Sequence, residues 1–459
     1  MNYKGEKLSI TIVGTGYVGL TTGVALAYLG HHIFCVDSKA EVVESLKKGV
    51  PTIYEHGIES LLHEASPNLS FYNHLDESLP EADIVIIAVG TPSKSNGDTD
   101  LSYVEDVARA IGRKMNPEKP IVVVNKSTVP IGTASRVKTV IKEELKKRGT
   151  EGNYYVASNP EFLREGAALY DTFYPDRIVV GAEELHAVNM LRQMYAPILE
   201  QTFIPPKDIS RPEGFGLPAF VTTSPTSAEL IKYASNAFLA MKISFINEIS
   251  IIADKVGADI REVSKGIGLD RRIGSGFLKA GVGWGGSCFP KDTRSLLFTG
   301  KQYGVDMPMV SASIEVNRRQ RMAVIEKLQA TLKIIRGSVI GILGLAFKPN
   351  TDDIRESPAI DIIKELLDMG ASVKVYDPVA MENYRAQFPE QDLIYTDSVE
   401  ETARESDALV LLTEWESFLH VAWDKLVYEM RNSIFIDGRN FLDGEDMRIW
   451  GYNYVGIGC

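Results

Sequence analysis

Short apolar runs alternate with helical patterns over the first two hundred residues. Residues 8–14 read LSITIVG, which is typical of a buried strand, and glycine-rich residues 14–19 then open an apolar, small-residue helix. A second strand ends at Asp37, and further strand-like runs occupy residues 82–89, 120–125, 154–160 and 177–181. This alternation predicts a doubly wound α/β domain.

The pattern changes after residue 200. Residues 201–225 contain five prolines and two glycines, which predict a loop and a domain boundary. Residues 226–256 then form a long helical pattern, with Thr226 or Ser227 as the expected N-cap before Glu229. More helices are expected up to about residue 330, interrupted by glycine-rich residues 281–286.

A second α/β pattern fills the remainder of the chain. Strand-like runs at 338–347, 372–378, 407–413 and 433–438 surround a helix at 358–369. We therefore expect a first α/β domain at 1–205, a Pro/Gly-rich insertion or linker at 206–225, a central helical domain at 226–330, and a second α/β domain at 331–459. The two α/β domains resemble each other in their pattern.

Bulk composition excludes several classes of protein. A net charge of −12 without a basic run argues against nucleic-acid binding, and no uninterrupted apolar stretch approaches the roughly 20 residues of a membrane-spanning helix. The N-terminus leads directly into a strand without room for a signal segment, and the three cysteines cannot form a disulfide framework. We expect a cytoplasmic protein without a membrane, nucleic-acid or metal partner.

A dinucleotide-binding fingerprint lies at the first strand-to-helix turn. Gly14 permits a tight turn, Gly16 lets the backbone approach a pyrophosphate, and Gly19 lets the helix pack closely on the strand. Asp37, at the end of the next strand, can accept hydrogen bonds from a ribose hydroxyl and would repel a 2′-phosphate. The pattern favours NAD over NADP as the cofactor.

The second α/β domain lacks this fingerprint. Residues 341–347 read GILGLAF, without the closely spaced first pair of glycines, so a second NAD is not expected. Asp377 ends a strand much as Asp37 does, but it precedes a proline and is interpreted as part of a strand-end turn.

Cys288 is the candidate nucleophile. It follows four glycines in residues 281–286 and precedes Pro290, a residue typical of the first turn of a helix. A helix N-terminus and nearby Lys291 both favour the thiolate form, and Asp292 lies one helical turn beyond Cys288. A buried structural role is the alternative for any single cysteine, but a core cysteine does not need so many glycines beside it.

Two further pairs of polar residues have a spacing that brings them together. Lys232 and Asn236 are one turn apart on the long helix, whose other positions are mostly apolar or small. Glu161 and Glu165 follow a strand end, the edge at which α/β sheets bind ligands. Taken singly, each of these charged residues has a solvated surface position as its alternative.

At these residues the sequence resembles the UDP-glucose/GDP-mannose dehydrogenase family, over nearly the whole chain. The motifs that carry the resemblance are GTGYVG (14–19), VGTP (89–92), KSTVP (126–130), NPEFLREG (159–166), AELIKYASNAF (228–238), GWGGSCFPKD (283–292), GLAFKPNTDDIRES (344–357) and DGRN (437–440). Two departures from the family pattern are Val42, where the family often carries a basic residue, and the length of the 201–225 segment.

The resemblance implies a four-electron oxidation of a UDP-sugar, closest to that of UDP-glucose, by two NAD⁺ through a thiohemiacetal and a thioester on Cys288. It implies a homodimer or higher homo-oligomer built on the central helices, and a C-terminal UDP-binding domain. The catalytic residues implied are Cys288, Lys232, Asn236, Asp292, Glu161 and Thr128, with the order of the two acids left open. The cofactor-binding residues implied are Gly14, Gly16, Tyr17, Val18, Gly19, Asp37, Thr91, Pro92, Ser127, Thr128, Glu165, Lys291 and Arg355. The substrate-binding residues implied are Glu161, Phe162, Leu163, Arg164, Glu165, Lys232, Asn236, Arg272 (from the neighbouring subunit), Phe277, Lys279, Gly281, Gly285, Phe347, Lys348 and Arg439.

Three other functions remain as alternatives. The same chemistry would serve GDP-mannose or a UDP-N-acetylhexosamine. A two-electron hydroxyacid dehydrogenase with a lysine base shares the two-domain plan, and a nucleotide-sugar sensor would keep the fold without the reaction. The sensor is disfavoured because Cys288, Lys232 and Asn236 are all present.

Overall fold

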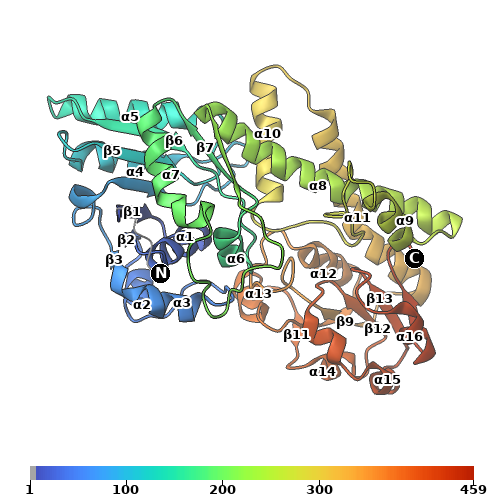
Figure 1. Cartoon of the computed structure of the whole chain (residues 1–459). Helices are drawn as coiled ribbons and strands as arrows, with labels where there is room; N and C mark the ends of the chain where they lie inside the picture. Colours follow the sequence, from blue (N-terminus) through green and yellow to red (C-terminus); the bar gives the residue numbers. More distant parts are fainter. Residues whose placement is uncertain (1–6) are drawn as a thin grey trace. The chain divides into compact units, whose positions relative to one another are not determined.

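The computed structural model describes residues 7–459, which form two compact units that divide after Ala234. The first unit contains an eight-stranded sheet of order β3-β2-β1-β4-β5-β6-β7-β8, in which only the β6–β7 pair is antiparallel (Figure 1). Its strands are β1 (Ser9–Val13), β2 (His32–Val36), β3 (Leu69–Tyr72), β4 (Ile84–Ile87), β5 (Ile121–Asn125), β6 (Tyr154–Ser158), β7 (Arg177–Ala182) and β8 (Ala219–Thr223). The predicted doubly wound α/β fold is confirmed.

Helices cover both faces of this sheet, because its central strands are apolar on both sides. In β4, Ile84 and Ile86 join one buried cluster, whereas Val85 and Ile87 join the other. The helices that accompany the sheet are α1 (Tyr17–Tyr28), α2 (Ala40–Lys47), α3 (Ile58–Ala65), α4 (Ser102–Lys114), α5 (Thr133–Lys147), α6 (Ala168–Phe173) and α7 (Leu185–Leu199).

The Pro/Gly-rich segment 206–225 is not loop throughout. It contains the edge strand β8, which pairs in parallel with β7 because Phe220, Val221 and Thr222 are aromatic or β-branched. Ile209, earlier in the segment, is buried in the core, and its carbonyl accepts a hydrogen bond of 3.2 Å from the Tyr174 hydroxyl. The segment is therefore part of the first unit's packing rather than an open linker.

Helix α8 (Pro225–Val256) begins in the first unit and ends in the second. Its N-cap is Ser224, whose hydroxyl accepts the Ser227 N–H at 3.1 Å, so the predicted caps Thr226 and Ser227 were wrong. Pro225, at the first helical position, has no N–H to satisfy and allows the earlier start.

Within residues 7–459, α8 is the one helix whose length and composition would let it cross a membrane, with a mean hydropathy of 1.3 over its most apolar window. Its buried polar residues argue for a core helix instead. Glu229, Lys232 and Asn236 are each less than a tenth exposed, and each contacts polar partners within its own unit.

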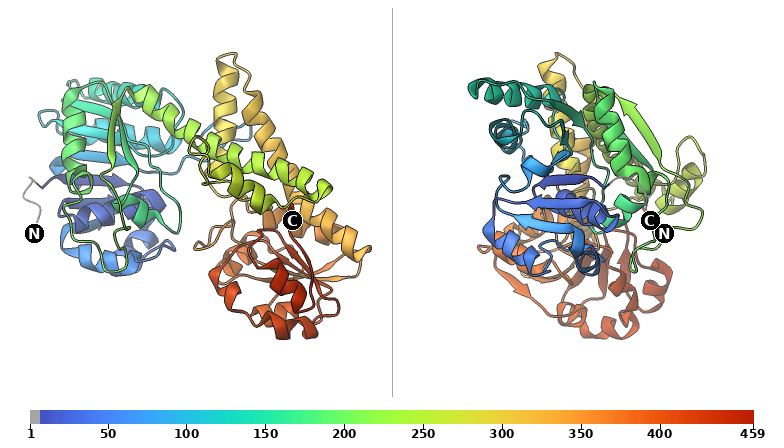
Figure 2. Two further views of the ribbon diagram at one scale, coloured as in Figure 1. Left: turned by 45° about the vertical axis from the view of Figure 1, so that its right-hand side comes forward. Right: turned by 60° about the vertical axis from the view of Figure 1, so that its left-hand side comes forward.

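The second unit places three more helices and a second sheet after α8. The helices are α9 (Ile260–Gly268), α10 (Phe289–Gln302) and α11 (Pro308–Leu332), of which α10 and α11 lie side by side (Figures 1 and 2). The sheet is entirely parallel, with the order β11-β10-β9-β12-β13-β14. Its strands are β9 (Val339–Leu343), β10 (Ser372–Tyr376), β11 (Leu393–Tyr395), β12 (Ala408–Leu411), β13 (Ile434–Asp437) and β14 (Asn453–Val455). Its helices are α12 (Pro358–Asp368), α13 (Met381–Gln387), α14 (Val399–Ala403), α15 (Trp423–Leu426) and α16 (Gly444–Ile449).

The strand order of this second sheet repeats that of the first six strands of the first sheet. The two α/β domains thus share a topology, as their sequence patterns indicate. In such sheets, ligands bind beyond the carboxyl ends of the strands, next to the point where the order reverses. For the two domains that point lies after β1 and β4, and after β9 and β12.

Candidate active site

The glycine loop after β1 has the geometry of a dinucleotide site. Gly14 has a φ of +96°, and a Cβ there would lie 2.6 Å from the Ala88 carbonyl oxygen. A Cβ on Gly19 would lie 1.8 Å from the Gly14 carbonyl oxygen, whereas one on Gly16 would meet nothing within 4 Å. Packing therefore requires the outer two glycines. Gly16 faces open space at the start of α1, where the N–H groups of Tyr17, Val18 and Gly19 can receive a pyrophosphate.

Asp37 follows β2 and remains half-buried. Its carboxylate accepts hydrogen bonds from the Thr15 N–H (3.0 Å), the Thr15 hydroxyl (2.8 Å) and the Lys39 N–H (3.0 Å), which aim it beside the glycine loop. A ribose hydroxyl could bind at its exposed side. The residues that surround this turn therefore fit NAD.

Asp377 occupies the matching place in the second sheet but has a different environment. It is 1% exposed, and its two oxygens accept hydrogen bonds from four backbone N–H groups and from the Trp415 indole. With its oxygens engaged in this way, Asp377 stabilises the turn, in agreement with its interpretation from the sequence.

Two motifs meet at the carboxyl ends of β4 and β5. The Thr91 hydroxyl donates to the Thr128 carbonyl at 2.9 Å, and the Ser127 hydroxyl donates to the Val89 carbonyl at 2.7 Å. The Pro92 carbonyl accepts the Asp100 N–H at 2.8 Å. VGTP and KSTVP are thus held together at the ligand edge of the sheet, as the cofactor assignment requires.

Glu161 and Lys232 form a buried ion pair in the first unit. Lys232 Nζ lies 2.8 Å from Glu161 Oε1, and their side chains are 4% and 5% exposed. Burial alone would raise the pKa of the Glu161 carboxyl, but Lys232, the Leu163 N–H at 2.6 Å and the charge of Lys126 together hold that pKa below its ordinary value. The Glu161 carboxylate is therefore stabilised in its charged form.

The sequence did not single out Lys126, which lies in the KSTVP motif beside this pair. Lys126 is buried, and its ammonium donates to Asn159 Oδ1 at 3.2 Å and to the Tyr195 hydroxyl at 3.1 Å. A buried lysine is rare without a role in a polar network. The sequence could have indicated Lys126 through its motif, KSTVP, which also contains the predicted site residues Ser127 and Thr128.

Other residues of the NPEFLREG loop have protein partners. The Phe162 ring lies between the Arg177 guanidinium, 3.9 Å from the ring centroid, and the Lys232 ammonium, 5.5 Å away. Arg164 pairs with Asp171 at 2.6 Å. The side chains of Phe162 and Arg164 thus fix the shape of the loop that carries Glu161 and Glu165.

Cys288 stands at the N-cap of α10 in the second unit and is partly exposed. Its carbonyl accepts the Asp292 N–H at 2.8 Å, which places Asp292 one turn further along the same helix. The Ser287 hydroxyl lies 3.5 Å from Cys288 Sγ. The predicted position of the thiol at the start of a helix is confirmed. Such a position favours a thiolate.

Asp292 is completely buried and links two helices. Its Oδ2 accepts a hydrogen bond of 2.6 Å from Asn236 Nδ2 on α8, and its Oδ1 lies 2.6 Å from Lys291 Nζ. Because buried carboxylates need such partners, Asn236 and Lys291 keep Asp292 in place next to the start of α10. Asn236, Cys288, Lys291 and Asp292 thus form one cluster.

The glycines before Cys288 are required by close contacts. A Cβ on Gly285 would lie 2.2 Å from the Glu356 carbonyl oxygen, and one on Gly286 would lie 2.6 Å from the Phe347 ring. A Cβ on Gly281 would lie 2.8 Å from the Gly438 carbonyl oxygen. The loop therefore runs directly against the GLAFKPN and DGRN motifs of the second sheet.

Arg439 joins these motifs around the glycine loop. Its guanidinium donates to the carbonyl oxygens of Leu412 (2.7 Å), Phe347 (3.1 Å) and Gly283 (3.2 Å). Buried Asp437 shapes the loop by accepting N–H groups from Arg439, Phe441 and Leu442 at 2.9 Å each. The predicted neighbours Gly281, Gly285, Phe347 and Arg439 are therefore brought together at the edge where a nucleotide would bind.

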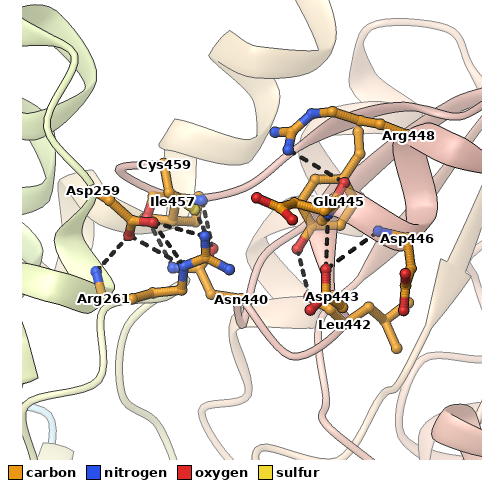
Figure 3. Close-up of polar contacts among 12 residues, drawn as sticks. Asp259, Arg261, Asn440, Leu442, Asp443, Glu445, Asp446, Arg448, Ile457 and Cys459 are labelled. Atoms are coloured by element: carbon orange, nitrogen blue, oxygen red, sulfur yellow. Dashed lines mark hydrogen bonds and ion pairs between the residues drawn. The ribbon is translucent and has the colours of Figure 1, made fainter.

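The next residue, Asn440, binds the end of the chain (Figure 3). Its Nδ2 donates to the Ile457 carbonyl at 2.9 Å, and its Oδ1 accepts the Ile457 N–H at 2.8 Å. Ile457 in turn is buried among residues of α8 and α9. The DGRN loop is thus held from both sides.

Some of the other predicted site residues lie on the surface, and the rest lie near the glycine loop or the start of α10. Arg272 pairs with Asp270 at 2.6 Å and its side chain is 89% exposed, while Lys279 is also exposed. The Phe277 ring lies 6.2 Å from the Phe289 ring at the start of α10. Arg355 pairs with Asp353, and its carbonyl accepts the Gly286 N–H at 2.9 Å, so it belongs to the glycine-loop surroundings within its unit.

Comparisons with family models match three consecutive parts of the chain. Residues 8–199 match the NAD binding domain of the UDP-glucose/GDP-mannose dehydrogenase family, residues 226–319 match its central domain, and residues 341–444 match its UDP binding domain. The glycine fingerprint, the Cys288 cluster and the GLAFKPN motif fall in these three parts in that order.

Similar proteins agree over the full length. The chain is 42% identical to the UDP-glucose 6-dehydrogenase TuaD of Bacillus subtilis, over 98% of this chain and 93% of that one. It is 43% identical to a UDP-glucose 6-dehydrogenase of Rhizobium meliloti, over 98% and 99% of the two chains.

Solved structures point to the same family. A UDP-glucose dehydrogenase from Pyrobaculum islandicum superposes with a TM-score of 0.88 at 38% identity, covering 100% of this chain and 99% of that one. A GDP-mannose dehydrogenase from Pseudomonas aeruginosa gives a TM-score of 0.52 at 29% identity, covering 98% and 100%. The chain belongs to the UDP-glucose/GDP-mannose dehydrogenase family, and it is an NAD-dependent oxidoreductase.

Proposed function

We propose that this enzyme oxidises UDP-glucose to UDP-glucuronate, with Cys288 as the covalent nucleophile. The observation that carries the proposal is the cluster around the start of α10. There a partly exposed thiol lies one helical turn from a buried carboxylate, and the adjoining glycine loop lies against the UDP-binding domain. The full-length similarity to UDP-glucose 6-dehydrogenases supports this substrate over GDP-mannose.

The sequence of bonds at the sugar C6 follows from the thiol. Bound NAD⁺ supplies the hydride acceptor for each of two oxidations, one molecule for each. In the first oxidation C6 loses a hydride and its hydroxyl loses a proton, which gives an aldehyde. The Cys288 thiolate adds to the carbonyl carbon of this aldehyde, and the oxygen takes a proton to give a thiohemiacetal. Loss of the second hydride and of the hydroxyl proton leaves a thioester. Water then cleaves the C–S bond, which releases the carboxylate and restores the thiolate.

Side chains on α8, on α10 and in the two motifs KSTVP and NPEFLREG have roles in this scheme. Lys232 and Asn236 donate hydrogen bonds to the oxygen on which negative charge develops. Asp292 positions the hydrolytic water, since it lies on the helix that begins at Cys288, while Glu161 keeps Lys232 charged and Thr128 supports the proton network. Gly14, Gly16, Gly19 and Asp37 hold the NAD.

The ratio of NADH formed to sugar consumed tests this proposal. We expect two NADH for each UDP-glucose, measured by absorbance with limiting substrate, because the tethered aldehyde cannot escape between the oxidations. GDP-mannose and a UDP-N-acetylhexosamine serve as matched substrates and should turn over much more slowly. A ratio of one with a released carbonyl product, or turnover of GDP-mannose alone, would contradict the proposal.

We also propose that the enzyme is a cytoplasmic homodimer built on α8. Phe238, Phe245 and Ile252 lie at seven-residue intervals on this helix, and their side chains are 62%, 51% and 55% exposed. Exposed apolar residues that recur at this spacing on one face of a helix are typical of an interface between helices, and this face is called the stripe below. Exposed Arg272 is then available to the neighbouring subunit, and the three unbridged cysteines suit a reducing compartment.

Sedimentation of the purified chain tests the dimer. We expect a mass of about twice the 50.7 kDa of one chain, and a monomer for Phe245→Asp, because a charge in the stripe must be desolvated on association. Tyr428→Asp, a change of an aromatic residue in the other part of the second unit that is more exposed than Phe245 (85% against 51%), is the control and should remain dimeric. A wild-type monomer, or a dimeric Phe245→Asp, would contradict this assignment.

A further inference from the structure

Helix α11 buries polar residues over its first half. A helix packed on a core normally buries an apolar stripe, and the second half of α11 does so with Val324, Ile325 and Leu328. In its first half the buried residues after Val310 are instead Ser313 (5% exposed), Asn317 (3%), Gln320 (1%) and Arg321 (8%). Buried polar groups need partners. The Ser313 hydroxyl donates to the Ser244 hydroxyl on α8, and the other three side chains find partners in the glycine loop before Cys288.

Asn317 binds the backbone of Trp284 on both sides of that residue. Its Oδ1 accepts the Trp284 N–H at 2.7 Å, and its Nδ2 donates to the Trp284 carbonyl at 2.9 Å. A Cβ on the preceding residue, Gly283, would lie 2.4 Å from Asn317 Oδ1, so the glycine gives the amide room to approach. Arg321 donates a further hydrogen bond of 3.0 Å to the Trp284 carbonyl.

Gly281 is bound in the same manner by two helices. Asn247 on α8 accepts its N–H at 2.9 Å, and Gln320 on α11 donates to its carbonyl at 3.0 Å. The Trp284 indole donates to the hydroxyl of Ser244 on α8 at 3.0 Å. Amide side chains therefore satisfy both backbone groups of Gly281 and both of Trp284.

This arrangement replaces secondary structure in a buried loop. The backbone of residues 281–286 is buried but belongs to no helix or strand, so the backbone groups of Gly281 and Trp284 need side chains as partners. Fixed side chains from two helices hold the loop in one conformation. Two residues beyond Gly286 the chain reaches Cys288 and α10.

We infer that Asn317 and Gln320 are positioning residues for Cys288, acting through the backbone of the glycine loop. Asn247 completes the set from α8. The inference rests on the proposed role of Cys288 as the nucleophile. Because a displacement of about 1 Å in a reacting group can cost a hundredfold in rate, a loop held at both backbone groups of Gly281 and of Trp284 sets where the thiolate meets the sugar carbon.

A purely structural role predicts a different result from a positioning role. If the amides only satisfy the loop backbone, their removal lowers thermal stability and leaves kcat of the folded enzyme unchanged. If they position the thiol, their removal lowers kcat, leaves KM for UDP-glucose nearly unchanged, and changes the pH dependence of Cys288 alkylation. The third readout involves no turnover.

The test compares Asn317→Ala and Gln320→Met with Val324→Ala. Val324 is completely buried on the same helix and packs in an apolar core, so its truncation destabilises α11 without removing a hydrogen bond to the loop. For the two amide variants we expect kcat to fall by about tenfold to a hundredfold. We also expect the midpoint pH for alkylation of Cys288 by iodoacetamide to rise, because the thiolate is no longer held at the start of α10. Val324→Ala should retain wild-type values in both assays.

Equal kcat and equal alkylation profiles in all three variants would overturn the inference. If Asn317→Ala fails to fold, as judged by circular dichroism and gel filtration, Gln320→Met decides, since methionine matches the shape of glutamine and removes only the bond to Gly281. A failure of the proposed function would show itself differently, as an active enzyme without Cys288. The alkylation profile would still report whether α11 positions the thiol.

Discussion

We expect Cys288→Ala to form UDP-glucuronate at least about four orders of magnitude more slowly than the wild-type enzyme, equivalent to more than about 5 kcal/mol in the activation barrier. Without the thiolate, the aldehyde is not captured, and no thioester can form for hydrolysis. The dissociation constant of NAD should remain within about twofold, because the variant leaves the glycine fingerprint and Asp37 unchanged. Product formation followed by chromatography, with NAD binding by fluorescence, provides the measurement.

Cys459→Ser is the matched control for this variant. Burial raises the pKa of the Cys459 thiol, and its hydrogen bond to Asn440 is 3.5 Å long, so the thiol is assigned no part in the proposed chemistry. We expect its activity to remain within about twofold of wild type. If Cys288→Ala retained substantial activity, or if both variants lost it equally, the covalent route would be wrong.

The second large effect is expected at the buried ion pair of Lys232 and Glu161. Lys232→Met should lower kcat by about three orders of magnitude, because the donor to the developing oxyanion is lost. It should also destabilise the protein by about 3–5 kcal/mol at neutral pH, since the Glu161 carboxylate is left buried without its counterion. Thermal unfolding and initial rates measure the two effects separately.

The pH dependence of stability should reverse its sign in this variant. In the wild type the pKa of Glu161 is below its ordinary value, so its contribution to stability is present above about pH 4.3 and is lost as the pH falls through the lowered pKa. In Lys232→Met that pKa is raised by burial, so stability should fall as the pH rises from about 5 to 8.

A double variant separates charge from chemistry at this pair. Lys232→Met with Glu161→Gln should recover much of the stability, because no buried charge remains, while its kcat should stay as low as that of Lys232→Met. Unchanged activity in Lys232→Met, or loss of stability that is independent of pH, would remove Lys232 from the mechanism.

Local features of the fold followed from the sequence because their causes are local. Gly14, Gly19 and Asp37 act through turns and neighbouring strands, so the fingerprint predicted their geometry correctly. The start of α10 at Cys288 was likewise predicted correctly, from Pro290. Long apolar runs likewise gave the central strands of both sheets.

Features that depend on distant partners were harder to predict. Strands β3, β11 and β14 were missed because each has three or four residues, too few to show a period, and β8 was hidden among prolines and glycines. The pairing of Glu161 with Lys232 and of Asn236 with Asp292 needed the fold to bring separate elements together. The burial of Asn317 and Gln320 could not be predicted, because polar positions on a helix are normally assigned to its solvent face.

Mass spectrometry of the enzyme during turnover shows whether Cys288 forms a bond to the sugar. The enzyme is mixed with UDP-glucose and NAD⁺, quenched in acid during turnover, and digested for peptide analysis. We expect a sugar-nucleotide adduct on the peptide that contains Cys288, absent when NAD⁺ is omitted and absent in Cys288→Ala. Accumulation of UDP-glucuronate while the Cys288 peptide remains unmodified at every quench time would contradict it.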